Sequence, residues 1–283
     1  GALDATHPPQ RNKVNHFAGG IAPDAFTLDA VDSPRNDNWF IVCLGARRGL
    51  TFLERQPEVD GAKLGVTGHS MGGRLTTMVT GIDPRVQASV PSCGGSGDFD
   101  GDPAKFPGTA ATKRSARDLA TIVENPYIAR IKVPTLWFSP TNDFHAHQDT
   151  FAHTWRNVPD ELLGLALSPH FNHRHADDAS LTATLWFEQH LKGKLTLPRT
   201  PTLQWARSAD GNASFTITPD LSRPVKEVRF YASTDTHTLT RFWRTIPVAA
   251  EGQVWRGSVP VHDTLEPLFV FANVVYAAPE DYR

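Results

Sequence analysis

The sequence predicts an α/β protein, in which helices cover both faces of a parallel sheet and a small β-sandwich follows. Up to about residue 195, short apolar runs with the composition of strands alternate with segments of helical periodicity. Beyond Pro198-Arg-Thr-Pro201, apolar and polar residues instead alternate in short runs that Gly, Pro, Asp and Ser separate. We therefore divide the chain into a first unit, residues 1–198, and a second unit, residues 199–283.

The elements of the first unit follow in a regular order. Residues 1–37, rich in Pro, Asn, Asp and Gly, predict an irregular segment. Residues 39–55 repeat apolar side chains at helical spacing, and Asp37 or Asn38 suits their N-cap. The other expected elements are strands at 63–67, 85–91, 133–139 and 163–168, helices at 71–80 and within 110–124, a loop at 94–108, and a helix that Asp178 caps and Gly193 ends.

The second unit contains five runs with the period of a strand. They are LQWAR, ASFTIT, EVRFYAS, VWRGSVPV and PLFVFANVVY. Three tryptophans, Trp205, Trp243 and Trp255, belong to this unit. In a small sandwich a tryptophan is expected in the core, and the alternative is an exposed surface for a sugar ring.

Composition limits the partners of the chain. A net charge of −2 over 283 residues excludes a protein that binds nucleic acid through a strongly basic surface. No apolar run approaches the roughly 18 residues of a membrane span, and the first residues lack the pattern of a signal peptide. We therefore expect neither a nucleic-acid nor a membrane partner, and the compartment stays open. Cys43 and Cys93 are expected to be buried and unpaired.

The motif GVTGHSMGGR places Ser70 between a predicted buried strand and a predicted helix. A turn of this kind lifts the hydroxyl above the strand tip and strains the backbone, so Gly68 and Gly72 are expected to avoid collisions. Because the helix directs its first amides toward this point, the Met71 N–H is the candidate oxyanion donor. The alternative is that Ser70 merely caps the helix.

A serine hydroxyl reacts only when a base, oriented by a third group, takes its proton. In this architecture the acid precedes the histidine, and the acid follows a later strand. Asp143 comes directly after the predicted strand 133–139 and is the candidate acid, with capping of a turn as its alternative role. Asp149 is the second candidate for the acid.

The loop after the predicted strand 163–168, in LALSPHFNHRHADD, offers His170, His173 and His175. His173 is the preferred base because the loop separates it from the strand enough to reach Ser70, and His170 is the alternative base. The competing interpretation is a metal site made of the three histidines. Since no carboxylate or cysteine motif supports such a site, we expect no metal.

Other polar residues near these loops have two interpretations each. His145 and His147 are expected to line the pocket or contact solvent, and His69 to pack under the serine turn. Arg74 faces an acidic or sugar substrate, or it forms a structural ion pair. The run GDFDGDP, with Asp98, Asp100 and Asp102, starts like a calcium loop but lacks its glycine and glutamate positions, so a solvated loop over the site is expected.

Three segments resemble the α/β-hydrolase superfamily: RRGLTFLERQPEVDGAKLGVTGHSMGG, IKVPTLWFSPTND and HFNHRHADDASLTATLWFEQHLKG. They are similar to the branch that contains acetyl xylan esterases, dienelactone-hydrolase-like proteins and prolyl-oligopeptidase-like enzymes. The resemblance covers residues 38–195 and implies Ser70 as nucleophile, Asp143 as acid and His173 as base, without a cofactor. It also implies a secreted or periplasmic location.

The resemblance further implies sheet strands before the serine strand and a loop among them that supplies a second oxyanion N–H. Only residues 1–69 precede Ser70, so we expect a partial hydrolase sheet, completed by an N-terminal fragment or a second polypeptide. The expected activity is that of a serine carboxylic-ester hydrolase working through an acyl-enzyme, on acetylated polysaccharide or small acyl esters. Two alternatives stay open: a serine peptidase of the prolyl-oligopeptidase or dipeptidyl-peptidase type, and a non-catalytic carbohydrate-binding protein.

Overall fold

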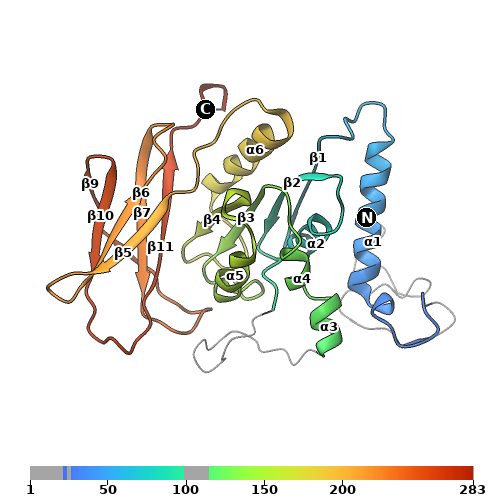
Figure 1. Cartoon of the computed structure of the whole chain (residues 1–283), viewed down its shortest axis with the longest axis horizontal. Coiled ribbons are helices and arrows are strands. Elements are labelled where there is room, and N and C mark those ends of the chain that lie inside the picture. The colour runs from blue at the N-terminus through green and yellow to red at the C-terminus, as the bar shows by residue number, and fades with distance from the viewer. Residues whose placement is uncertain (1–21, 24–26, 99–114, 283) are drawn as a thin grey trace.

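A computed structural model describes residues 22–23, 27–98 and 115–282. It contains one parallel sheet of four strands in the order β1-β2-β3-β4, which lies between helix α1 and two antiparallel sheets (Figure 1). The strands are β1 (Leu64–His69), β2 (Val86–Ser92), β3 (Thr135–Pro140) and β4 (Leu163–Ser168). The parallel sheet with helices and the antiparallel sheets after it confirm the predicted α/β fold class.

Helices precede, connect and follow these strands. They are α1 (Asn38–Glu54), α2 (Met71–Thr80), α3 (Ala116–Thr121), α4 (Asn125–Ile128), α5 (Gln148–Thr154) and α6 (Asp177–Lys192). The predicted helix at 110–124 is therefore shorter in its described part, and its residues 110–114 lie outside the described residues. Sequence periodicity did not predict α4 and α5, because four and seven residues give too few turns to show a helical repeat.

The ends of the two long helices test the predicted caps. Asp37 caps α1, since its Oδ1 accepts a hydrogen bond of 2.7 Å from the Trp39 N–H. The prediction that Asp178 caps α6 is wrong: Ala176 occupies the cap, and Asp178 lies in the first turn, where its charge suits the helix dipole. Gly193 ends α6 in the left-handed region, at φ 63°, as predicted.

Strand β3 is buried on both faces. Trp137, with no exposed surface, packs with Phe151 of α5 and the neighbouring Trp155. Leu136 and Phe138 belong to a different cluster, which includes residues of α6. Because adjacent side chains of a strand point to opposite faces, α5 and α6 cover opposite sides of the sheet.

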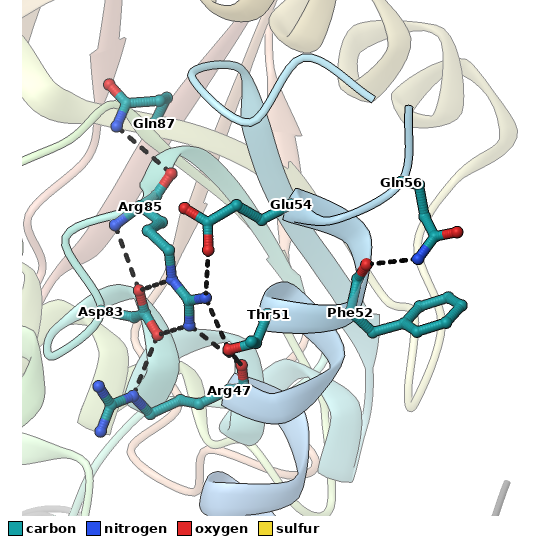
Figure 2. A network of polar contacts seen from close by, with 8 residues as sticks. All are labelled: Arg47, Thr51, Phe52, Glu54, Gln56, Asp83, Arg85 and Gln87. Carbon is teal, nitrogen blue, oxygen red and sulfur yellow. Dashed lines mark hydrogen bonds and ion pairs between the residues drawn. The ribbon is translucent and has the colours of Figure 1, made fainter. Parts of the chain in front are cut away.

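A polar network fixes α1 to the turn that precedes β2 (Figure 2). The Asp83 carboxylate, almost fully buried, accepts hydrogen bonds from Arg85 Nη2 (2.7 Å) and Nε (2.8 Å) and from Arg47 Nε (3.0 Å). Arg85 Nη1 also donates to Glu54 and Thr51 of α1. The hydrogen bonds from Arg85, and then the one from Arg47, hold the pKa of Asp83 well below its ordinary value.

The antiparallel sheets have the strand orders β5-β6-β10-β9 and β11-β7-β8. The strands are β5 (Thr202–Arg207), β6 (Ala213–Thr218), β7 (Val225–Ser233), β8 (Arg244–Ile246), β9 (Ala249–Glu251), β10 (Val254–Val259) and β11 (Phe269–Tyr276). Phe215 of one sheet and Phe230 of the other share one hydrophobic cluster. The three-residue strands β8 and β9 were not predicted, since they are too short to show alternation.

The tryptophans of the second unit divide between core and surface. Trp243 is buried, and Trp255 packs against the shared cluster of the two sheets. Trp205, on the edge strand β5, is instead 70% exposed. The expectation that these tryptophans belong to the core therefore holds for two of the three.

The two edges of the parallel sheet differ. At β4, Asn273 Nδ2 of β11 donates to the Leu167 carbonyl (2.7 Å), so the second unit lies against this strand. At the other edge, β1 pairs only with β2 among the described residues, and the expected fragment or polypeptide that completes the sheet stays a prediction.

Cys43 and Cys93 are buried and free, as expected. Within the described ranges, no helix has the length and apolar composition needed to cross a bilayer.

Candidate active site

Ser70 lies on a sharp turn between β1 and α2. Its backbone has φ 60° and ψ −120°, a strained conformation for a residue with a side chain. A Cβ on Gly68 would lie 2.5 Å from backbone atoms of Gly72, so the predicted need for glycine holds there. The same expectation is wrong for Gly72, whose Cβ would meet no atom within 4 Å; instead Gly73 is crowded, with its Cβ 2.5 Å from the Ser92 carbonyl oxygen.

Three side chains from separate loops form one hydrogen-bonded relay. His173 Nε2 lies 2.6 Å from Ser70 Oγ, and His173 Nδ1 lies 3.0 Å and 3.2 Å from the two oxygens of Asp143. With the Nδ1 proton donated to the carboxylate, the Nε2 lone pair faces the serine hydroxyl. The order along the relay is therefore hydroxyl, imidazole, carboxylate.

The carboxylate end of the relay is fully buried. The Asp143 side chain has no exposed surface, while that of His173 is 22% exposed. Asp143 Oδ1 also accepts hydrogen bonds from the backbone N–H groups of His145 (2.8 Å) and Ala146 (3.2 Å). These two donors fix the orientation of the carboxylate.

The start of α2 faces the hydroxyl. Met71 is the first residue of this helix, and Ser70 occupies the cap position without capping through its side chain. Since the first N–H groups of a helix have no partner within it, the Met71 N–H is free of intrahelical bonds. The positive end of the α2 dipole lies beside Ser70.

The alternative base and the alternative acid lie outside the relay. His170, with φ 63°, has its Nε2 2.8 Å from the Trp243 carbonyl oxygen of the second unit. Asp149 accepts two hydrogen bonds from Arg241, of 2.7 Å and 3.0 Å, in a buried ion pair. Both residues therefore bind the second unit to the loops of the first.

Aromatic side chains flank the relay imidazole. The Phe144 ring, 59% exposed, has its centroid 4.7 Å from that of His173, and the His145 ring meets His173 edge-on at 5.6 Å. His147 Nε2 lies 3.2 Å from the Phe144 carbonyl oxygen, and burial lowers the pKa of His147.

His69 differs from the expectation that it packs under the turn, because its side chain is exposed and its ring lies 5.0 Å from that of His173. Its Nδ1 is 3.2 Å from Ser92 Oγ, a contact that follows from the β1–β2 register, in which His69 pairs with Ser92. Partial desolvation lowers the pKa of His69 and of His175, and burial raises the pKa of Cys93 to about 11. Sequence reasoning missed Ser92 and Cys93, whose only signal was their place at the end of a strand beside β1.

Two further interpretations are resolved. Arg74 is buried, with its Nε 3.2 Å from Glu124 Oε1 and its guanidinium 4.0 Å above the Trp39 ring, so it forms a structural ion pair. Of the acidic run GDFDGDP, Asp100 and Asp102 lie outside the described residues, and the Asp98 N–H donates to Asn125 Oδ1.

Part of the chain matches the model of one protein family. Residues 42–178 match the model of the dienelactone hydrolase family. No curated protein sequence matches the chain significantly.

Similar folds occur among solved structures. Acetyl xylan esterase 1 from Thermoanaerobacterium sp. is 18% identical over 60% of this chain and 60% of its own, with a TM-score of 0.43. Acetyl xylan esterase from Paenibacillus sp. is 20% identical over 61% of this chain and 59% of its own (TM-score 0.48). The acylaminoacyl peptidase of Pyrococcus horikoshii is 15% identical over 57% of this chain and 29% of its own, with a TM-score of 0.44. The chain thus spans about 60% of the length of the two esterases.

The parallel sheet, the strained serine turn at the end of β1 and the family match all fall in the same part of the sequence. This part of the chain therefore has the α/β-hydrolase fold, and its residues 42–178 match the model of the dienelactone hydrolase family.

Proposed function

We propose that the protein is a serine carboxylic-ester hydrolase that works through an acyl-enzyme. The observation that supports this most directly is the 2.6 Å contact between His173 Nε2 and Ser70 Oγ. Such a contact lets the imidazole take the hydroxyl proton as the oxygen attacks an ester carbonyl. The hydrogen bonds from His173 Nδ1 to Asp143 support the matching role of the carboxylate.

The proposed reaction has two halves. Ser70 Oγ bonds to the carbonyl carbon while its proton passes to His173 Nε2, and the Met71 N–H donates to the oxyanion that forms. His173 then returns the proton to the leaving alkoxide. The alcohol departs, and the acyl group stays on Ser70 Oγ as an ester. Water, deprotonated by the same imidazole, then attacks the acyl carbon; the bond to Ser70 Oγ breaks, the imidazolium returns its proton to Oγ, and the acid leaves. The buried Asp143 stabilises each imidazolium.

As substrates we propose acyl esters of carbohydrates or of small alcohols. The resemblance of the three sequence segments to acetyl xylan esterases supports the carbohydrate class. The exposed rings of Phe144 and Phe242, which contact His173 and His170, offer apolar surfaces on which a sugar ring can stack.

We also propose that residues 1–198 form the catalytic domain and residues 199–283 an accessory domain. The ion pair of Arg241 with Asp149 and the contact of His170 with Trp243 support a role for the accessory domain in holding the loops of the site.

Hydrolysis of p-nitrophenyl acetate tests the proposal. The Ser70→Ala variant should lose measurable turnover, while Ser222→Ala, at an exposed turn of the second unit, should keep wild-type rates. Turnover retained by Ser70→Ala would defeat the proposal. A proline-containing peptide amide, tested beside the ester, separates the esterase from the peptidase alternative.

A further inference from the structure

Beside the relay, three side chains with metal-binding atoms surround the hydroxyl of Ser92. This serine ends β2 and pairs with His69 at the end of β1. Its Oγ lies 3.2 Å from His69 Nδ1, 3.2 Å from His175 Nδ1 and 3.6 Å from Cys93 Sγ. The ligand atoms of His69, Cys93 and His175 all lie within 4.8 Å of one another. One thiol and two imidazoles thus lie close together around Ser92.

The outer hydrogen bond of the His175 ring favours this arrangement. His175 Nε2 lies 3.3 Å from Ser180 Oγ. With its Nε2 proton donated to Ser180, His175 directs the Nδ1 lone pair toward Ser92. Histidines that bind metals commonly donate their other ring N–H to an oxygen in this way.

The backbone at the thiol is also unusual. Cys93 is fully buried, and its φ of 51° lies in the left-handed region, which residues with a side chain seldom adopt. A hydrogen bond of 2.9 Å from its N–H to the Phe138 carbonyl holds this conformation. Strained residues of this kind gather at functional sites, and the other two non-glycine residues with positive φ in the described chain, Ser70 and His170, lie on the neighbouring loops.

We propose that His69 Nδ1, Cys93 Sγ and His175 Nδ1 bind a Zn²⁺ ion, with water in the fourth position. Thiolate and imidazole together suit zinc, which takes nitrogen at about 2.0 Å and sulfur at about 2.3 Å. As the metal–sulfur bond forms, the thiol proton passes to solvent and the ion loses the waters that the three ligands replace. In a tetrahedral site the ligands lie roughly 3.5 Å apart, so the cluster closes by about 1 Å.

Zinc at this point joins the loop that carries His175 to the tips of β1 and β2. A ligand that binds only the folded protein stabilises it by mass action. The site is distinct from the Ser70 relay, and neither its formation nor its test needs catalytic turnover.

The test is a titration of the full-length protein with Co²⁺, which reports a bound thiolate through an intense charge-transfer absorption. We expect this band at about one equivalent, its loss when Zn²⁺ displaces Co²⁺, and a rise in the thermal midpoint with Zn²⁺. Cys93→Ala should abolish the band, and His175→Ala should weaken Co²⁺ binding at least tenfold. Cys43→Ala, at the other buried cysteine, should keep it.

Absence of the band in the wild-type protein, its survival in Cys93→Ala or its loss in Cys43→Ala would overturn the proposal. If Cys93→Ala fails to fold, unchanged Co²⁺ binding by His175→Ala, whose imidazole is only partly buried, would overturn it equally. A protein that binds Co²⁺ without hydrolysing esters would defeat the proposed function alone.

Discussion

At the scale of single residues, Asp143 accepts hydrogen bonds from His173 and from two backbone N–H groups. The backbone donors hold the carboxylate in place, and the hydrogen bond between Asp143 and His173 Nδ1 sets which nitrogen of His173 carries the proton. We expect Asp143→Asn to lower kcat for p-nitrophenyl acetate by roughly 10³- to 10⁴-fold, because an amide can donate to Nδ1 and reverse the tautomer.

The fold should survive this change, since Asn still accepts from the N–H groups of His145 and Ala146. Circular dichroism checks the fold, and Asp160→Asn, at an exposed site, serves as the matched control. A kcat within threefold of wild type would contradict the role of Asp143.

The sequence could predict which residue types meet at Ser70, because the order of strand ends along the chain fixes the order of the loops. From the sequence, His173 is favoured over His170 as the base because it lies farther from the end of the preceding strand. His170 contacts Trp243 of the second unit, more than 70 residues away, and no local sequence pattern predicts this contact. The convergence of His69, Ser92 and Cys93 depends on strand register and was invisible for the same reason.

At the scale of elements, the turn between β1 and α2 depends on one glycine of the pair that flanks Ser70. A Cβ on Gly68 would meet the backbone of Gly72 at 2.5 Å, whereas a Cβ on Gly72 meets nothing. Gly68→Ala should therefore lower the free energy of unfolding by about 2 kcal/mol and remove most activity, because overpacking displaces the turn. Gly72→Ala should be tolerated and can stabilise α2, since alanine favours helices.

Urea unfolding and ester hydrolysis of the two alanine variants measure this difference. Equal losses in both would show that the turn needs both glycines, as the motif alone suggests.

The network between α1 and β2 predicts a dependence of stability on pH (Figure 2). Since Arg85 and Arg47 hold the pKa of Asp83 below its unfolded value of about 3.9, the ionised carboxylate stabilises the folded state. This contribution is fully present above about pH 5 and is lost as the pH falls toward the folded pKa. Asp83→Asn should cost about 2 kcal/mol near neutral pH.

The gap in unfolding free energy between wild type and Asp83→Asn should therefore shrink as the pH falls below about 4. Urea titrations at a series of pH values measure it. A gap that stays constant with pH would show that the ion pair contributes little.

At the scale of the whole molecule, the second unit holds the loops that carry the relay. Asn142, next to Asp143, donates to the carbonyl oxygens of Leu239 (3.2 Å) and Arg241 (2.8 Å). The Arg241 side chain has no exposed surface and pairs with the buried Asp149. A hydrolase sheet and a β unit that sequence patterns predict separately thus share one buried ion pair.

Removing the arginine should disturb both units, because it leaves a buried carboxylate without its partner. We expect Arg241→Ala to cost about 3 kcal/mol or more in unfolding free energy and to lower kcat/KM as the Asp143 turn loosens. Arg244→Ala, at an exposed position of β8, is the control. Wild-type stability and activity in Arg241→Ala would mean that the units act independently.

The overall architecture was predictable because each unit has its own periodicity, while the contacts between the units were not. Arg241 and Asp149 are 92 residues apart, and neither lies in a pattern that points to the other. The short elements α4, α5, β8 and β9 also escaped prediction, because tertiary packing rather than local periodicity defines them.

The central claim is that His173 and Asp143 make Ser70 a nucleophile. Reaction of the native protein with a fluorophosphonate, followed by intact-mass and peptide mass spectrometry, tests it most directly. The account predicts a single adduct per chain, on Ser70, that forms much more slowly in His173→Ala. An unlabelled protein, or an adduct on another residue, would contradict it.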